Sequence, residues 1–174
     1  MLDVFVSRLS NKLLLYCSLV PDPLAAMEDA FLHGWDGLSV YAFPPAAVLQ
    51  RFLVRARRAR DFRAILIAPD WPQKVWYPDL LALLVDDPVE LPLWDRLLRQ
   101  SHWRYFHPAV HALSLHAWRL SSVSSELEAF REELLERCPS ASVLPLPVSI
   151  RGSGWCSAPG VVDRALLQFR PLFQ

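Results

Sequence analysis

Short apolar runs alternate with helical patterns in the first half of the chain. The runs Leu2–Val6, Leu38–Ala42 and Ala64–Ala68 have the length and composition of buried β-strands. Between the second and third runs, Ala46–Arg60 places its apolar residues at the spacing of one helix face, at Leu49, Phe52, Leu53 and Ala56. A strand, a helix and a further strand in this order predict that the two strands pair in parallel. Ala64–Ala68 is apolar throughout, which is typical of a strand covered on both faces.

Weaker patterns continue this alternation. The turn at Pro21–Pro23 precedes a helical pattern through Leu24, Met27 and Phe31. The alternating segment Leu113–Ala117 predicts a later strand, which can pair antiparallel to the others. The other predicted elements are a helix through Leu80, Leu81 and Leu84, a short element at Val89–Leu93 and a short helix near Trp94–Leu98.

The last third of the chain begins with a capping signal. Ser125–Glu128 fits a capping box, which predicts the start of a helix. This helix carries Leu127, Phe130 and Leu134 on one face and ends at Pro139. Beyond it, Val143–Pro147 is too interrupted by proline for a central strand, and Arg151–Gln174 forms a separate tail.

These patterns predict an α/β fold. We expect a three-layer, mostly parallel, Rossmann-like sheet flanked by helices, with a helical C-terminal extension. The three apolar runs belong to this sheet, so the fold prediction is wrong if Val40 and Ile67 lie in separate sheets. We divide the chain into an α/β domain (1–120), an amphipathic helix with a proline-rich linker (121–150) and a tail (151–174).

Composition limits the function classes. The chain has 174 residues, is 53% hydrophobic, and balances 18 basic against 18 acidic residues. This length and apolar fraction suit one globular domain with a substantial core. Zero net charge argues against a protein whose main function is to bind the phosphate backbone of nucleic acids. No apolar run is long enough for a membrane span or a signal peptide, so we expect an intracellular protein, nuclear or cytoplasmic, without a membrane partner.

The stretch Val40–Ala47 runs a strand straight into two prolines and then into the helical pattern. Proline has no N–H for a sheet, so the pair ends the strand abruptly in a rigid corner. In open α/β sheets ligands bind at the carboxyl ends of strands. The corner is therefore the first place to look for a site.

Several segments of the chain, in order, carry a family resemblance: DVFVSRLSNK, PDPLAAMEDAF, YAFPPAAVLQRFLVRAR, AILIAPDWPQKVWYPDLLALL and LHAWRL. Over roughly residues 2–120 the chain resembles the region of the Pol polyprotein of DIRS-type retrotransposons that lies between ribonuclease H and the tyrosine recombinase. Trp155–Val161, followed by Leu166, Leu167 and Phe169, is similar to the opening helices of that recombinase. The resemblance implies that the chain is a truncated or host-retained piece of Pol, with other parts of Pol as partners.

That Pol region is similar to phage-type Dam methyltransferases, which transfer a methyl group from S-adenosylmethionine to adenine in DNA. Their N-P-P-Y motif ends a strand: the Asn side chain and a proline carbonyl accept the amino hydrogens of a flipped-out adenine, and the aromatic ring stacks on the base. Here the motif is Phe43-Pro44-Pro45-Ala46, which lacks both the Asn acceptor and the stacking ring. The resemblance therefore implies a degenerate methyltransferase-like domain without catalysis.

Other family positions concern the cofactor. Asp3 matches an acidic residue that helps to hold S-adenosylmethionine, and Asp29 with Trp35 matches a pattern that precedes the proline corner. Because the family's segment upstream of the first strand completes the cofactor pocket and a chain that starts at Met1 lacks it, we expect no cofactor. S-adenosylmethionine remains the expected cofactor only if the domain is active.

Three further groups of residues allow a functional and a structural interpretation. Histidines 102, 107, 111 and 116 could hold a metal, but Pro108 breaks the spacing, and we expect no metal site. Asp70–Pro72 with Trp76 and Tyr77 could stack a base or cover the sheet as aromatic core. Positive charge is concentrated after the corner, and it either forms a solvated helix face or binds DNA or RNA weakly and nonspecifically, through Arg51, Arg55 and Arg58.

The sequence contains no other recognisable catalytic or metal-binding motif. Cys17, Cys138 and Cys156 form neither a disulfide framework nor a thiolate metal motif, and no nucleophilic triad or glycine-rich phosphate loop is present. Two function classes follow: a non-catalytic Pol-derived module with a nucleic-acid-handling or architectural role, which we favour, and an active DNA adenine methyltransferase. A host interaction module that reuses the fold cannot be separated from the first by sequence.

Overall fold

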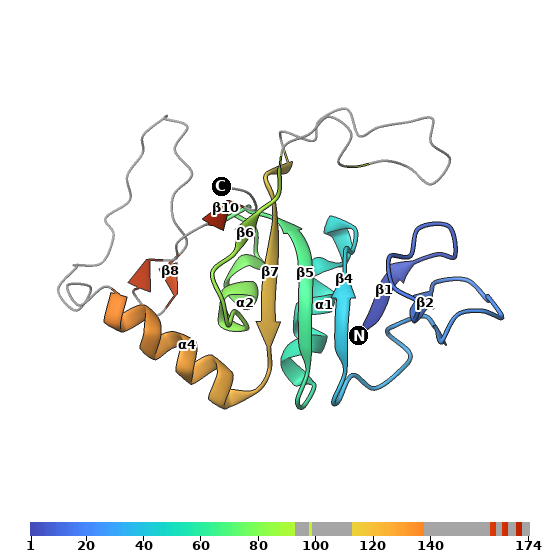
Figure 1. The fold of residues 1–174 in the computed structure, drawn as a ribbon, viewed down its shortest axis with the longest axis horizontal. Helices are drawn as coiled ribbons and strands as arrows, with labels where there is room; N and C mark the ends of the chain where they lie inside the picture. The colour runs from blue at the N-terminus through green and yellow to red at the C-terminus, as the bar shows by residue number, and fades with distance from the viewer. Residues whose placement is uncertain (93–97, 99–112, 138–160, 163–164, 167–169, 172–174) are drawn as a thin grey trace.

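The computed structural model describes residues 1–92, 98, 113–137, 161–162, 165–166 and 170–171. It shows an α/β protein built on one mixed, mostly parallel sheet (Figure 1). The sheet has the strand order β10-β6-β7-β5-β4-β1-β2-β3. Its strands are β1 (Leu2–Val6), β2 (Tyr16–Ser18), β3 (Met27–Glu28), β4 (Ser39–Ala42), β5 (Arg63–Pro69), β6 (Val89–Glu90), β7 (Leu115–Ser121) and β10 (Arg170–Pro171).

The direction of the sheet changes only at β7. Strands β3, β2, β1, β4 and β5 run parallel, and β7 lies antiparallel between β5 and β6. Val40 in β4 pairs with Ala64 in β5, so Val40 and Ile67 share one sheet. The prediction of three parallel strands is therefore confirmed. The later antiparallel strand is present, but it spans Leu115–Ser121 and not the predicted Leu113–Ala117.

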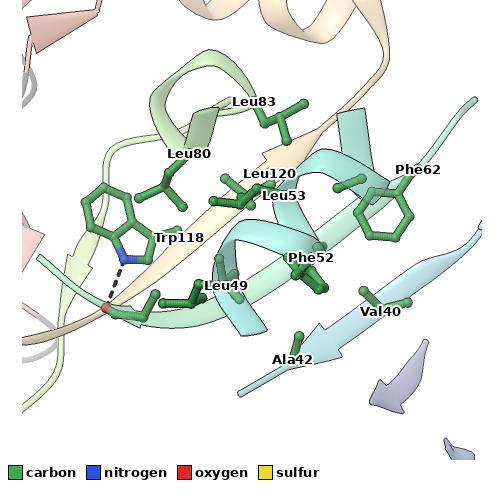
Figure 2. Packing of buried hydrophobic residues seen from close by; sticks show 14 of the residues in the cluster. Val40, Ala42, Leu49, Phe52, Leu53, Phe62, Leu80, Leu83, Trp118 and Leu120 are labelled. Atoms are coloured by element: carbon green, nitrogen blue, oxygen red, sulfur yellow. Dashed lines mark hydrogen bonds between the residues drawn. The ribbon is translucent and has the colours of Figure 1, made fainter. Parts of the chain in front are cut away.

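The helical pattern after the proline corner forms a short 3₁₀ turn, η1 (Ala46–Val48), and then α1 (Leu49–Arg58). Its inner face is fully buried against β4, β5 and β7, as Figure 2 shows for Leu49, Phe52 and Leu53. Burial of an aromatic or leucine side chain of this kind stabilises the fold by about 2–3 kcal/mol. The predicted amphipathic helix is confirmed, with an end two residues earlier.

A second helix lies beside α1 on the same face of the sheet. α2 (Tyr77–Ala82) contributes Leu80 to the core, and Gln50 of α1 donates a hydrogen bond to Asp79 of α2 at 3.1 Å. Trp118 of β7, the largest of the fully buried side chains, donates from Nε1 to the carbonyl of Ala68 at 3.0 Å (Figure 2). This bond satisfies the one polar atom of the indole ring.

On the opposite face of the sheet, the connections between the first three strands contribute no helix. Segments 7–15 and 19–26, which join β1 to β2 and β2 to β3, contain no helix. A parallel crossover that includes a helix needs about a dozen residues or more, and these connections are shorter. In the described residues α1 and α2 lie behind β4, β5 and β7 (Figure 1), and Ile65 on the other face stays 37% exposed, so the three-layer arrangement stays a prediction.

The helix predicted through Leu24, Met27 and Phe31 is also wrong. The Asp22 carboxylate accepts the N–H of Leu24, and the N–H of Ala26 donates to the carbonyl of Tyr16. Met27 then pairs with Cys17 as β3 joins the sheet. Tertiary pairing uses the backbone groups that a helix would need, and it overrides the apolar spacing.

The described C-terminal residues contain one helix and short strands. α4 (Ser124–Arg137) begins one residue before the predicted capping box and buries Phe130 and Leu134 in the main core. The predicted helical extension is confirmed for α4 and wrong for the described tail residues, which form β8 (Val161–Val162), β9 (Ala165–Leu166) and β10. The predicted helix near Trp94–Leu98 and the linker 138–150 lie outside the described residues, apart from Leu98.

Candidate functional site

The candidate site lies at the carboxyl edge of the sheet, between β1, β4 and β5. The chain adds β2 and β3 on one side of β1, and β4 and β5 on the other side. The point between β1 and β4 where this order reverses is a topological switch point, and open α/β sheets bind ligands at such points. β4 ends at Ala42 and β5 at Pro69, so the proline corner and the Asp70–Trp71 turn follow neighbouring parallel strands at the same edge. The structure thus places these two sequence-predicted features at the same edge of the sheet.

The proline corner presents little polar chemistry. Phe43 is 38% exposed, Pro44 is buried, and Pro45 and Ala46 are exposed. The carbonyl of Pro45 accepts the N–H of Val48 at 2.8 Å and starts η1. The side chains of Phe43 and Ala46 contain no hydrogen-bond acceptor, so neither can hold the amino group of a base.

Asp3 lies at the amino half of β1 and is fully buried. Its Oδ2 accepts the backbone N–H of Lys12 at 2.6 Å, which fastens segment 7–15 to the sheet. Its Oδ1 is buried without a hydrogen-bond partner. Burial raises the pKa of the Asp3 carboxyl above its usual range, although the backbone N–H groups of Lys12 and Leu13 oppose the shift.

Asp29 is joined to the end of β1 opposite to Asp3. Its backbone N–H donates to Ser18, which pairs with Val6 at the other end of β1. The Asp29 carboxylate accepts the N–H of Phe31 at 3.0 Å and stabilises a turn in which the Asp29 φ is 40°. The structure therefore does not bring the two predicted cofactor residues together.

Trp35, which with Asp29 matches the family pattern before the proline corner, is a core residue. It is buried, donates from Nε1 to the carbonyl of Ala30 at 2.7 Å, and stacks on Phe62 with ring centroids 5.3 Å apart. Its side chain supports the connection between β3 and β4.

Aromatic side chains fill the space beside the end of β1. Phe5 has a φ of 66°, a left-handed conformation that is unusual for a bulky residue. Its ring centroid lies 5.3 Å from that of Phe31 and 5.9 Å from that of Phe52.

The turn after β1 also lacks glycine. In doubly wound nucleotide-binding sheets this first turn is rich in glycine so that the backbone can approach a ligand, whereas here Ser7 and Ser10 bond to each other. Sequence reasoning missed Phe5; the glycine-free turn after Leu2–Val6 was the available signal.

The segment after β5 contains a hydrogen-bonded pair of polar side chains, Asp70 and Tyr77. The hydroxyl of Tyr77 donates to Asp70 at 2.7 Å, and burial, together with this bond, raises the pKa of Tyr77 well above its usual range. Trp76 and Tyr77 are buried, which confirms the aromatic-core interpretation for them. Trp71 is only partly buried, and the Lys74 ammonium lies 5.5 Å from its ring centroid.

The arginines after the corner lie on and around α1. The guanidinium of Arg51 lies 3.9 Å from the ring centroid of Phe31, and Arg55 donates from Nη2 to the carbonyl of His33 at 2.5 Å. Arg58 is exposed. Two neighbours are paired instead: Arg57 with Asp79 at 3.3 Å and Arg63 with Glu126 at 2.6 Å.

The histidine and cysteine positions add no described metal site. His102, His107 and His111 lie outside the described residues, and His116 is buried with Nδ1 2.9 Å from the carbonyl of Ser114. Within the described ranges, no group of three or more His, Cys, Asp or Glu side chains could hold a metal ion. Burial raises the pKa of the Cys17 thiol, which disfavours the reactive thiolate.

No family model, curated protein or solved structure matches the chain. None of the helices in the described part of the chain is long and apolar enough to span a membrane.

Proposed function

We propose that the chain is a methyltransferase-like domain, of the kind found in the Pol polyprotein of DIRS-type retrotransposons, that acts by binding and does not transfer methyl groups. One observation supports this most directly: a Phe43-Pro44-Pro45-Ala46 corner lies at the carboxyl end of β4, beside the switch point of the sheet. In the resembled family the N-P-P-Y motif likewise ends a strand.

The strand order supports the methyltransferase-like part of the proposal. β3, β2, β1, β4 and β5 follow the doubly wound order 3-2-1-4-5. The sixth and seventh strands are then exchanged, with β7 inserted antiparallel beside β5. This exchange distinguishes the sheet from the all-parallel 3-2-1-4-5-6 order of dinucleotide-binding domains.

The corner itself supports the loss of catalysis. Methyl transfer to adenine needs acceptors that take the amino hydrogens and make the nitrogen nucleophilic. The Phe43 side chain has no acceptor, so the group that the Asn side chain supplies in the motif is missing. Removal of one such preorganised group typically lowers a rate by about a hundredfold to a thousandfold, and here the stacking ring is missing as well.

The surroundings of β1 support the loss of the cofactor. Phe5, Phe31 and Phe52 pack together beside the first turn, where a ligand would approach the backbone. Asp3 lies in the amino half of β1, is buried, and accepts a hydrogen bond from the backbone of Lys12 in segment 7–15. An S-adenosylmethionine molecule would have to displace this packing.

The test combines cofactor binding with turnover. We expect S-adenosylmethionine to leave the melting temperature of the chain unchanged, because a ligand that binds only the folded state must raise it. We also expect no transfer of labelled methyl groups to adenine-containing DNA. The variant Phe43→Asn/Ala46→Tyr restores both motif side chains, and Phe43→Leu/Ala46→Tyr is its matched control, with the ring but no acceptor.

Methyl transfer by the unmodified chain, lost in Asp3→Ala, would overturn the proposal in favour of an active adenine methyltransferase. Activity gained only by Phe43→Asn/Ala46→Tyr would support a retained scaffold with a disabled corner.

A further inference from the structure

Charge is separated between two helices even though the whole chain is neutral. α1 carries Arg51, Arg55, Arg57 and Arg58 and no acidic residue. α4 carries five glutamates: Glu126, Glu128, Glu132, Glu133 and Glu136. The net charge of the whole chain is zero, but the surface of α1 is strongly basic.

Three of the arginines share one line along α1. Arg51, Arg55 and Arg58 are four and then three residues apart, which places them on one side of a helix. Leu49, Phe52, Leu53 and Ala56 occupy the opposite, buried side. We call the line of Arg51, Arg55 and Arg58 the arginine face.

The arginine face keeps its positive charge. Arg51 lies over the Phe31 ring and Arg55 donates to the His33 carbonyl, so both are held by uncharged partners. Among the described residues no carboxylate forms an ion pair with Arg51, Arg55 or Arg58, whereas Arg57 is paired with Asp79. The contacts of Arg51 and Arg55 also lower the side-chain entropy that a ligand would otherwise have to remove.

We propose that the arginine face binds the sugar-phosphate backbone of a nucleic acid without reading its sequence. A guanidinium presents a fork of donors that matches phosphate oxygens, and one oriented by a ring or a carbonyl keeps further N–H groups free. The inference rests on the binding role proposed above, but it does not depend on whether methyl transfer occurs.

The dimensions of the face favour a nucleic acid over a second copy of the chain. Arg51 and Arg58 are seven residues apart, a rise of about 10 Å along the helix. This length suits contact with a few phosphates, whereas a stable protein interface buries about 1,200 Å² or more. The glutamates of α4 are the complementary surface that a second copy would offer, and two of them, Glu126 and Glu133, are already paired with Arg63 and Arg137.

The experiment measures binding of labelled single-stranded DNA, and of RNA of the same sequence, by fluorescence anisotropy over increasing salt. The test variant is Arg51→Ala/Arg55→Ala/Arg58→Ala. The matched control is Arg57→Ala/Arg63→Ala/Arg119→Ala, which removes the same charge from arginines that are paired with carboxylates. Circular dichroism and thermal melting establish that both variants are folded.

We expect the unmodified chain to bind both probes at low salt and to lose affinity steeply as salt rises from about 50 to about 200 mM, because each phosphate contact releases counterions. The test variant should bind at least about tenfold more weakly, and its slope of log affinity against log salt should flatten by about 2. The control variant should change the affinity by less than about threefold.

Equal losses in the two variants would overturn the proposal, because they would show a response to total charge only. Undetectable binding at low salt would overturn it too. Concentration-dependent self-association that disappears in the test variant, without nucleic-acid binding, would assign the face to a second copy. None of these outcomes depends on S-adenosylmethionine or on methyl transfer, so the two proposals fail separately.

Discussion

Asp3 shows how one buried carboxyl can serve structure at the position where the family resemblance implies a cofactor contact. The carboxyl fastens segment 7–15 through Lys12 and leaves Oδ1 without a partner. A buried carboxylate with an unsatisfied oxygen is costly, and the raised pKa of Asp3 expresses this cost. The neighbouring Tyr41 on β4 responds as well: burial, and then the charge of Asp3, raises the pKa of the Tyr41 hydroxyl.

This shift predicts the pH dependence of stability. Because the pKa of Asp3 is higher in the folded than in the unfolded chain, its contribution is fully present below the unfolded value of about 3.9 and is lost as the pH rises through the folded pKa. We therefore expect Asp3→Asn to become more stable, relative to the unmodified chain, as the pH rises from about 4 to neutrality. Urea unfolding of both proteins across this range measures the difference.

Asp22→Asn is the matched control, with the opposite sign. The N–H of Leu24 and then the Tyr16 hydroxyl lower the pKa of Asp22, so its contribution is present above the unfolded pKa and is lost as the pH falls. A free-energy difference for Asp3→Asn that does not change with pH would show that the carboxyl titrates as it does in the unfolded chain.

At the scale of elements, prediction succeeded where local signals agreed with the tertiary structure and failed where tertiary pairing overrode them. The amphipathic face of α1 has four buried positions and forms as predicted, because the pattern is long enough to determine the period. The segment through Leu24, Met27 and Phe31 contributes β3 and no helix, because β2 offers it parallel hydrogen bonds that apolar spacing does not report. The degenerate corner was visible in the sequence, whereas Phe5 with its positive φ depends on packing against Phe31 and Phe52, which no local pattern reports.

α4 is attached to the rest of the fold by a partly buried ion pair. Arg137 lies 2.7 Å from Asp87, whose side chain is fully buried. We expect Arg137→Met to lower the free energy of unfolding by about 2 kcal/mol, below the 3–5 kcal/mol of fully buried pairs because Arg137 is 26% exposed. Denaturant unfolding measures the loss.

Arg119→Met tests the same change at an exposed pair. Arg119 is 68% exposed and lies 3.4 Å from Asp86, so its replacement should cost less than about 1 kcal/mol. A cost for Arg137→Met no larger than that for Arg119→Met would mean that packing of Phe130 and Leu134, without the ion pair, holds α4.

At the scale of the whole molecule, we expect the centre of the sheet to be more stable against local unfolding than the edge formed by β3. β4 and β5 lie beneath α1 and between fully paired neighbours, whereas β3 is a two-residue strand at the edge, without a helix over segment 19–26. The sequence predicted the parallel strands, but the order 3-2-1-4-5 depends on where each crossover returns, and apolar spacing does not encode that choice.

This difference predicts a gradient of hydrogen exchange. Amides of β4 and β5 should exchange only through global unfolding, and amides of β2 and β3 should exchange faster, at least about tenfold, through local opening. Native-state exchange measured by NMR or mass spectrometry tests the gradient. Uniform protection from β3 to β5 would contradict it.

The pairing of β5 with β7 also bears on how the chain is made. β5 ends at Pro69, but the strand that covers its free edge ends at Ser121, about fifty residues later. A chain synthesised from its N-terminus can close the local β4-α1-β5 unit first, while β5 still presents unpaired backbone groups and Trp118 has not yet left the ribosome. During that interval the apolar edge of Ala64–Ala68 can pair with another nascent chain. The speed of translation between residues 70 and 121 therefore bears directly on how much of the protein escapes aggregation.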